Sequence, residues 1–320
     1  MAQESSKAFL ASPEPRGGYR SALVTPTYYV DLEHCRWLVD TVSRYVPEDV
    51  PHYLIVDYAD KGLFAPLASS RTKVLYKEDV LRGRLRQVPF ARRWWVGLGS
   101  PPVRGWIVQQ LIKLYLHEVL SEDFFVLVDS GVFFVKPYDP RHLVKDGKVQ
   151  LFAEKGEYFA KHAMVPKWHA LGAELLGLPV VPAYDMGYVA QPAIWRRDNL
   201  LQLHRHIEQA TGRPSFRRLT RTRTMSEYYI YGMHADLVLG ERSGHYHSSV
   251  NVAHCYWDRT PLSLAGLREF KARLEPRHQV AMIDEKSRTP LDSVREVFGA
   301  SQGSGPAAYP VARAPAPSDR

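Results

Sequence analysis

Cysteine and long apolar runs are scarce in this sequence. Cys35 and Cys255 are the only cysteines among 320 residues, which excludes a disulfide framework and argues against a zinc site built from cysteines. No run approaches the roughly 18 consecutive apolar residues that a membrane-spanning helix needs. The N-terminal segment MAQESSKAFLASPEPRGG lacks the apolar stretch of a signal peptide. We therefore expect a cytoplasmic protein without a transmembrane segment, in which both thiols are buried and reduced.

Glycine-rich phosphate-binding signatures are also missing. The sequence contains neither Gly-x-Gly-x-x-Gly nor Gly-x-x-x-x-Gly-Lys-Ser/Thr. These absences argue against a dinucleotide-dependent oxidoreductase and a P-loop NTPase.

Acidic residues are outnumbered by basic ones. The chain has 42 Lys and Arg residues against 34 Asp and Glu residues, a formal charge of +8, which suits nucleic acid, anionic lipid or a phosphorylated small molecule. Much of the excess lies in residues 82–93 (RGRLRQVPFARR) and 213–223 (RPSFRRLTRTR). Each stretch is either a solvated basic loop or part of an anion-binding rim. Nucleic-acid binding is the weaker alternative, because no recognised nucleic-acid module accompanies these arginines.

The two ends of the chain differ in composition from its middle. Residues 1–18 and 301–320 are rich in small and polar residues and proline, so we expect them to be disordered around one folded domain at 19–300. Within the domain, short apolar runs alternate with helical patterns, which predicts an α/β protein with a mainly parallel sheet flanked by helices. The predicted strands are 21–24, 53–56, 73–76, 124–128, 132–135 and 149–153, and a helix is predicted at 32–45.

The strongest helical pattern covers residues 105–120. Its apolar residues repeat with the spacing of one buried helix face: Val108, Leu111, Ile112, Tyr115 and Val119. A second stripe on the opposite side consists of Trp106, Gln110, Lys113 and His117. This stripe is either an ordinary solvated face or the wall of a ligand site.

An aspartate stands where the most apolar predicted strand ends. Residues 124–128 are apolar at every position, as in a central strand covered on both faces, and Asp129 follows them. In open α/β sheets the carboxyl ends of the strands face the ligand crevice, so Asp129 is placed to meet a ribose, a metal ion or a sugar. Other candidates at the same edge are Asp57, Thr25, Thr27 and Tyr28. The structural alternatives are a turn aspartate and a plain strand-to-helix connection.

Four segments occur in the order that a bacterial family of GT-A-like proteins shows. They are VTPTY at 24–28, RGWIVQQLIKL at 104–114, VDSGVFFVKP at 128–137 and SEYYIYG at 226–232. Over roughly residues 20–260 the chain resembles this family, DUF6492, to which glycosyltransferase activity is commonly assigned. The third segment resembles the Asp-x-Asp segment of GT-A glycosyltransferases, with Gly131 in place of the second aspartate.

The resemblance implies a GT-A-like, Rossmann-type domain that transfers a sugar from a nucleotide-sugar to a hydroxyl-bearing acceptor. The donor would bind in the half at about 19–153 and the acceptor in the half at about 154–300. The expected donor-binding residues are Thr25, Thr27, Tyr28, Asp57, Arg104, Trp106, Gln110, Lys113, Asp129 and Ser130. Mn²⁺ or Mg²⁺ would be held by Asp129 and His254. Asp185 and Glu227 are the candidates for the acid–base role, although Glu227 also suits the N-terminus of a helix and His254 a structural position.

The glycine at position 131 affects the expected metal binding, because the second carboxylate of an Asp-x-Asp motif normally ligates the ion beside the diphosphate. Three outcomes stay open. Asp129 holds a metal together with distant ligands, cationic side chains such as Lys113 and Arg104 replace the metal, or the site has lost transfer activity. The last outcome would make the protein a non-catalytic relative that binds a nucleotide or a carbohydrate.

Overall fold

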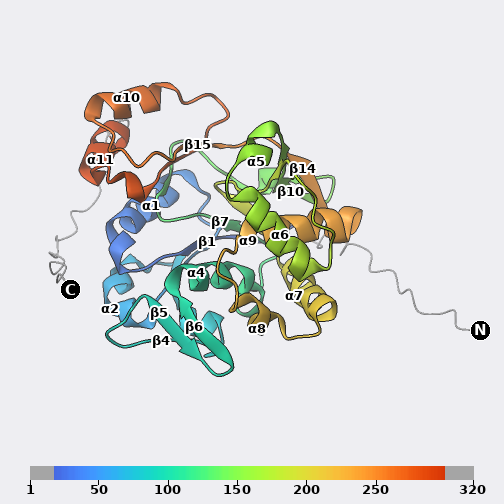
Figure 1. The fold of residues 1–320 in the computed structure, drawn as a ribbon. Coiled ribbons are helices and arrows are strands. Elements are labelled where there is room, and N and C mark those ends of the chain that lie inside the picture. The colour runs from blue at the N-terminus through green and yellow to red at the C-terminus, as the bar shows by residue number, and fades with distance from the viewer. Residues whose placement is uncertain (1–17, 300–320) are drawn as a thin grey trace, which may run out of the picture.

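A five-stranded sheet runs through the middle of the protein in a computed structural model that describes residues 18–299 (Figure 1). The strand order is β13-β7-β1-β2-β3. The strands are β1 (Ser21–Pro26), β2 (His52–Val56), β3 (Thr72–Tyr76), β7 (Phe124–Leu127) and β13 (Ala193–Arg196). β1, β2, β3 and β7 are parallel, and β13 is antiparallel to β7. The predicted mainly parallel α/β class is confirmed, whereas the predicted disordered segments, 1–18 and 301–320, lie outside the described residues except for Gly18.

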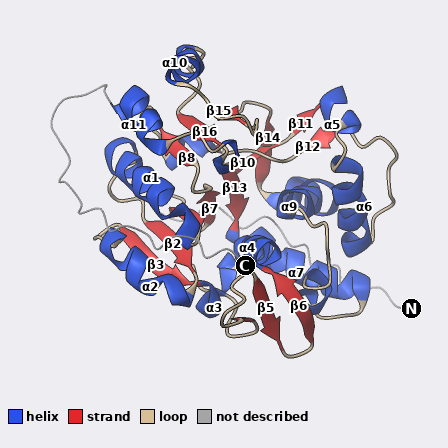
Figure 2. Ribbon diagram, turned by 60° about the vertical axis from the view of Figure 1, so that its left-hand side comes forward, coloured by secondary structure: helices blue, strands red, loops and turns tan. Residues whose placement is uncertain are grey.

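Helices cover both faces of this sheet. Leu23 and Val126 pack on the face of α1 (Leu32–Tyr45), while their neighbours Val24 and Leu127 pack on the face of α4 (Gly105–Leu114), because successive residues of a strand point to opposite sides. The helices that share the apolar cluster of α4 are α6 (Val165–Leu176), α7 (Arg197–Thr211) and α9 (Glu227–Met233). Figure 2 shows α1 and this second group on opposite sides of the sheet.

The predicted helix boundaries are partly right. The helix at 32–45 is confirmed as α1, but α4 ends at Leu114 and a 3-10 turn, Leu116–Glu118, follows it. The chain leaves helical geometry at Tyr115, so the i+11 position no longer lies on the buried face. Val119 is therefore 40% exposed, contrary to the prediction.

Small sheets and helices surround the central layer. A meander of β4 (Arg86–Gln87), β5 (Trp94–Gly97) and β6 (Ser100–Arg104) leads directly into α4. Another sheet contains β8 (Val132–Phe134), β15 (Ala253–Tyr256) and β16 (Val280–Ile283), and it packs with α10 (Leu264–Ala272) and α11 (Leu291–Gly299). A third contains β9 (Val144–Lys145), β10 (Lys148–Phe152) and β14 (His245–Ser248), and a fourth pairs β11 (Glu154–Lys155) with β12 (Met186–Gly187).

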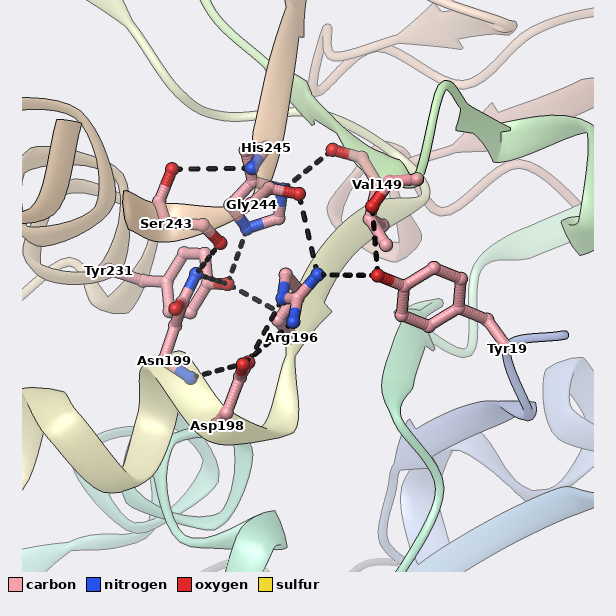
Figure 3. A network of polar contacts seen from close by, with 10 residues as sticks. Tyr19, Val149, Arg196, Asp198, Asn199, Tyr231, Ser243, Gly244 and His245 are labelled. Carbon is pink, nitrogen blue, oxygen red and sulfur yellow. Dashed lines mark hydrogen bonds and ion pairs between the residues drawn. The ribbon is translucent and has the colours of Figure 1, made fainter. Parts of the chain in front are cut away.

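A buried polar network fixes β13, α7, α9 and β14 to one another (Figure 3). Arg196 pairs with Asp198 at 2.7 Å, and its backbone N–H donates to Tyr231 Oη at 2.7 Å. His245 Nδ1 lies 2.8 Å from the carbonyl oxygen of Val149, which can only accept, so Nδ1 carries the proton and Nε2 accepts from the Tyr231 hydroxyl at 2.7 Å. Burial lowers the pKa of His245 to about 4, which keeps the ring neutral in this network at pH 7.

Candidate functional site

Residues that follow the four parallel strands line one cavity of about 950 Å³. They are Tyr28 after β1, Asp57 after β2, Lys77 after β3 and Asp129 after β7. Parallel strands end at the same edge of a sheet, and β1 and β7 flank the point where the strand order reverses. The cavity therefore lies where α/β proteins of this topology bind ligands.

The opposite wall comes from α4 and the meander that precedes it. Trp106, Gln110 and Lys113 project from α4 into the lining. Gln110 and Lys113 are only 4% exposed, whereas Trp106 is 53% exposed. The second stripe of this helix is thus not a solvated face; its first three members form a cavity wall, and His117 is buried outside the lining.

Lys113 is a buried cation in the cavity lining that forms ion pairs with two carboxylates. Its Nζ lies 3.0 Å from Asp129 Oδ1 and 3.0 Å from Glu227 Oε1, and it donates to Tyr228 Oη at 3.1 Å. Burial lowers the pKa of Lys113, but the surrounding negative charges, that of Asp129 foremost, raise it well above its usual value. One permanent cation therefore lies between two carboxylates from different halves of the chain.

Two glutamines complete this arrangement. Gln191 donates from Nε2 to Asp129 Oδ2 at 2.5 Å and to Tyr228 Oη at 3.2 Å, and its Oε1 accepts from the backbone N–H of Asp129 at 3.3 Å. Gln110 Oε1 accepts from the backbone N–H of Glu227 at 3.2 Å. The Nε2 of Gln110 is buried and has no hydrogen-bond partner within residues 18–299. A buried amide donor that lines a cavity and lacks a partner is available to a ligand.

A second pair of carboxyl groups lies on another part of the lining. Asp31 is buried and accepts from Ser130 Oγ at 3.0 Å. Burial, together with the neighbouring Glu285 carboxylate, raises the pKa of Asp31 to about 8. The pair of Asp31 and Glu285 therefore retains a proton to higher pH than an isolated carboxyl group would.

Cations surround the remainder of the cavity. Lys77 pairs with Asp57 at 2.8 Å, and Arg92 pairs with Asp60. Arg93 and Arg104 also line the cavity, and neither has a carboxylate partner in the described part of the chain. The Arg104 guanidinium lies 5.5 Å from the centre of the Trp94 ring. Arg93 and Arg104 are thus positive charges free to meet an anion.

The described side chains do not by themselves enclose a Mn²⁺ or Mg²⁺ ion, which beside a phosphate takes one or two carboxylates together with waters and phosphate oxygens. Across residues 18–299, no three His, Cys, Asp or Glu side chains lie close enough to share one ion. Both carboxylate oxygens of Asp129 already have partners in Lys113 and Gln191. A Cβ at Gly131 would lie 3.0 Å from the carbonyl oxygen of Ile283, so a second aspartate there would require β16 to shift by a few tenths of an ångström.

The structure brings most of the predicted site residues together. Those that line the cavity are Tyr28, Asp57, Arg104, Trp106, Gln110, Lys113, Asp129, Ser130 and Glu227. Glu227 is also the first residue of α9, which confirms its helix-terminal position, while its acid–base role stays a prediction.

Four predicted residues do not line the cavity. Thr25 and Thr27 are fully buried inside the edge of the sheet, and Thr25 Oγ1 bonds His52 Nε2 at 3.0 Å. Asp185 lies 3.7 Å from Lys155 Nζ near β12. His254 stacks on Phe270 with ring centres 4.3 Å apart. The structure therefore does not place His254 with Asp129 as a metal-ligand pair.

Sequence reasoning missed several residues of the lining. Lys77 directly follows the predicted strand at 73–76, so the rule that found Asp57 and Asp129 could have found it as well. Asp31, Gln191 and Glu285 carry no comparable signal, because tertiary packing alone brings them to this edge.

Fold and site together define an α/β protein with a charged cavity at the carboxyl edge of a mainly parallel sheet. Residues 22–257, more than half of the chain, match the model of a family of unknown function, DUF6492. The chain belongs to this family. No curated protein matches it.

One solved structure that the chain resembles is the apo form of WbbM, described as a bifunctional glycosyltransferase. The TM-score is 0.45 and the identity 11%, over 84% of this chain and 46% of the other. The chain thus spans less than half of that protein's length, and a similarity at this level supports no conclusion about activity. Within the described residues, no helix is both long enough and apolar enough to span a membrane.

Proposed function

We propose that this protein is a glycosyltransferase that binds a nucleotide-sugar in the cavity at the carboxyl edge of its sheet. The observation that carries the proposal is the convergence of the four strand ends and α4 on one cavity, with Arg93 and Arg104 unpaired beside exposed tryptophans. A diphosphate needs such cations, and a nucleobase or sugar ring packs well on an aromatic face.

Transfer breaks the bond between the sugar C1 and the diphosphate oxygen and forms a bond from C1 to the acceptor oxygen. The acceptor hydroxyl gives up its proton, for which Glu227 is the candidate base. Lys113 holds Glu227 in position at 3.0 Å. Asp129, whose side chain is 40% exposed, can accept hydroxyl hydrogens of the donor.

The charge that develops on the departing nucleoside diphosphate must be stabilised. Arg93 and Arg104 supply two positive charges without a carboxylate partner in the described residues. Since Asp129 belongs to no group of three metal-ligating side chains in the described residues, we propose that these arginines take the place of the metal. Mn²⁺ or Mg²⁺ is then expected to have little effect on donor binding.

A thermal-shift screen with UDP, GDP, CDP and dTDP, each in EDTA and in Mn²⁺ or Mg²⁺, tests this proposal. A ligand at 100 times its dissociation constant stabilises the folded protein by roughly 2.7 kcal/mol. We expect one nucleotide to raise the melting temperature equally with and without metal. A shift that requires metal would contradict the arginine assignment and leave nucleotide binding intact. No shift with any nucleotide would reject the donor site itself.

Variants separate binding from folding. Asp129→Asn should weaken binding of the responding nucleotide and abolish sugar transfer, with little change in melting temperature. Asp292→Asn on α11, whose side chain is 97% exposed, is the matched control and should change neither. If the wild-type protein binds the nucleotide-sugar but transfers or hydrolyses no sugar with any acceptor tested, the non-catalytic alternative holds.

A further inference from the structure

The outer face of the β4–β6 meander exposes a row of apolar side chains. Trp94, Val96 and Leu98 alternate along β5 and the turn after it, with Trp94 39% and Val96 44% exposed and Leu98 fully exposed. Phe90, in the turn before β5, is also fully exposed. Trp94 and Val96 share one face of β5, and Phe90 and Leu98 lie in the turns at its two ends. Several neighbouring exposed apolar side chains mark an interaction surface more often than single ones do.

This face is an ordered part of the fold. Trp95 and Val103, the inward-facing partners in the β5–β6 register, are buried in the main core. A Cβ at Gly97 would lie 1.9 Å from the carbonyl oxygen of Arg84, so only glycine allows β5 to pass the chain there. The core therefore fixes Trp94 and Val96 in their outward orientation.

Arginines frame the apolar row on both sides. Arg86 on β4 pairs in register with Val96, and Arg104 on β6 pairs with Trp94. At the end of the hairpin, a guanidinium nitrogen of Arg217 lies 3.1 Å from the position that a Cβ at Gly99 would occupy. The two basic stretches of the sequence, 82–93 and 213–223, thus meet around one apolar face.

The meander lies in a long stretch of the sequence whose charged residues are all positive. Residues 80–117 contain seven Lys and Arg residues and no Asp or Glu. Arg86 and Arg217 are exposed and have no ion-pair partner within residues 18–299. This combination of exposed Trp, Phe and Leu side chains with arginines on both sides suits the surface of an anionic bilayer. There, aromatic rings enter the headgroup layer and guanidinium groups bind lipid phosphates.

We propose that the outer face of the β4–β6 meander docks on a membrane surface that contains anionic lipids. Figures 1 and 2 show the meander at the end of the molecule opposite α10. Trp94 and Arg104 belong both to this face and to the lining of the cavity. Docking therefore brings the cavity next to the bilayer. The inference does not depend on the proposed glycosyl transfer.

Flotation of the full-length protein with vesicles tests the docking surface. We compare vesicles of phosphatidylcholine with vesicles in which about a third of the lipid is the anionic phosphatidylglycerol. The wild type should float with the anionic vesicles only. Phe90→Ser with Leu98→Ser should lower the partition coefficient by roughly tenfold or more, since each side chain loses its apolar contact with lipid.

The charge contribution is tested separately. Arg86→Gln and Arg217→Gln should each lower the partition coefficient about fivefold, because one arginine near an anionic surface contributes about that factor. Neither residue lines the cavity, so nucleotide binding should stay unchanged. The matched controls are Val180→Ser with Val181→Ser, which are 60% and 47% exposed in the loop after α6, and Arg273→Gln directly after α10. These controls should float like the wild type.

Several outcomes would overturn the proposal. The wild type fails to float with anionic vesicles, or the Phe90/Leu98 variant floats as well as the wild type, or the controls lose binding to the same extent. If the hairpin variants change the oligomeric state in size-exclusion chromatography and leave vesicle binding unchanged, the face is a protein interface instead. Melting temperatures within about 2 °C of the wild type, as expected for fully exposed positions, show that the variants are folded.

Discussion

Replacing Lys113 with methionine should destabilise the protein strongly, because it leaves two carboxylates without their cation. The pair with Glu227 is buried on both sides, with side chains 5% and 6% exposed. Removing one partner of such a pair costs about 3 to 5 kcal/mol. Asp129 is 40% exposed, so its pair with Lys113 adds at most about 1 kcal/mol after solvent screening.

Urea unfolding at pH 7.5, followed by tryptophan fluorescence, measures this loss. The raised pKa of Lys113 means that its contribution is complete below the ordinary lysine pKa of 10.5 and is lost only as the pH rises through the folded value. The pH chosen therefore lies inside the window in which the ion pair is fully formed.

The double variant Lys113→Met with Glu227→Gln decides whether the cost is electrostatic. Removing the buried carboxylate as well takes away the uncompensated charge, so the double variant should recover most of the stability that the single variant lost. A loss below about 1 kcal/mol in Lys113→Met would refute the reasoning. Equal losses in the single and the double variant would instead indicate a packing effect of the lysine stem.

Three further predictions concern stability and the metal. Leu111→Ala removes a fully buried side chain of α4 and should cost about 2 to 5 kcal/mol, measured by the same urea unfolding. Burial lowers the pKa of His204 to about 3 and that of His245 to about 4, against 6.5 for free histidine. At acidic pH the unfolded chain therefore binds more protons than the folded protein, and the stability present above pH 6.5 should fall as the pH drops toward 4. An unfolding midpoint that is unchanged between pH 7 and pH 5 would contradict this prediction. Gly131→Asp would not simply restore an Asp-x-Asp site, because its Cβ meets the Ile283 carbonyl at 3.0 Å. We expect a loss of about 1 to 3 kcal/mol and no metal-dependent nucleotide binding, which thermal shift with and without Mn²⁺ would detect.

Local patterns in the sequence determined six of the strands and the first helix. The runs at 53–56, 73–76 and 124–128 each match an observed strand within one residue at either end, and the helix at 32–45 matches α1. These elements follow from the period of the apolar residues, which any stretch of chain carries in itself. The placement of Asp57 and Asp129 at one edge follows as well, because parallel strands share a carboxyl end.

The polar stripe of α4 shows where local patterns stop being informative. The spacing of Trp106, Gln110 and Lys113 placed them on one side of the helix, but a spacing does not tell whether that side meets water or another part of the chain. Glu227 and Tyr228 arrive there from α9, more than 110 residues later, and bury Lys113 between them.

What the sequence by itself determined is the α/β class, the sheet edge that carries the cavity and nine of the 32 residues that line it. Tertiary structure alone decided that Asp31 and Glu285 share a pocket, that Ile283 fills the space beside Gly131 and that two basic stretches meet on one apolar face. The physical reason is the range of the interactions. Periodicity is set by neighbours along the chain, whereas burial, pairing and pKa depend on groups that only the folded core brings within a few ångströms of one another.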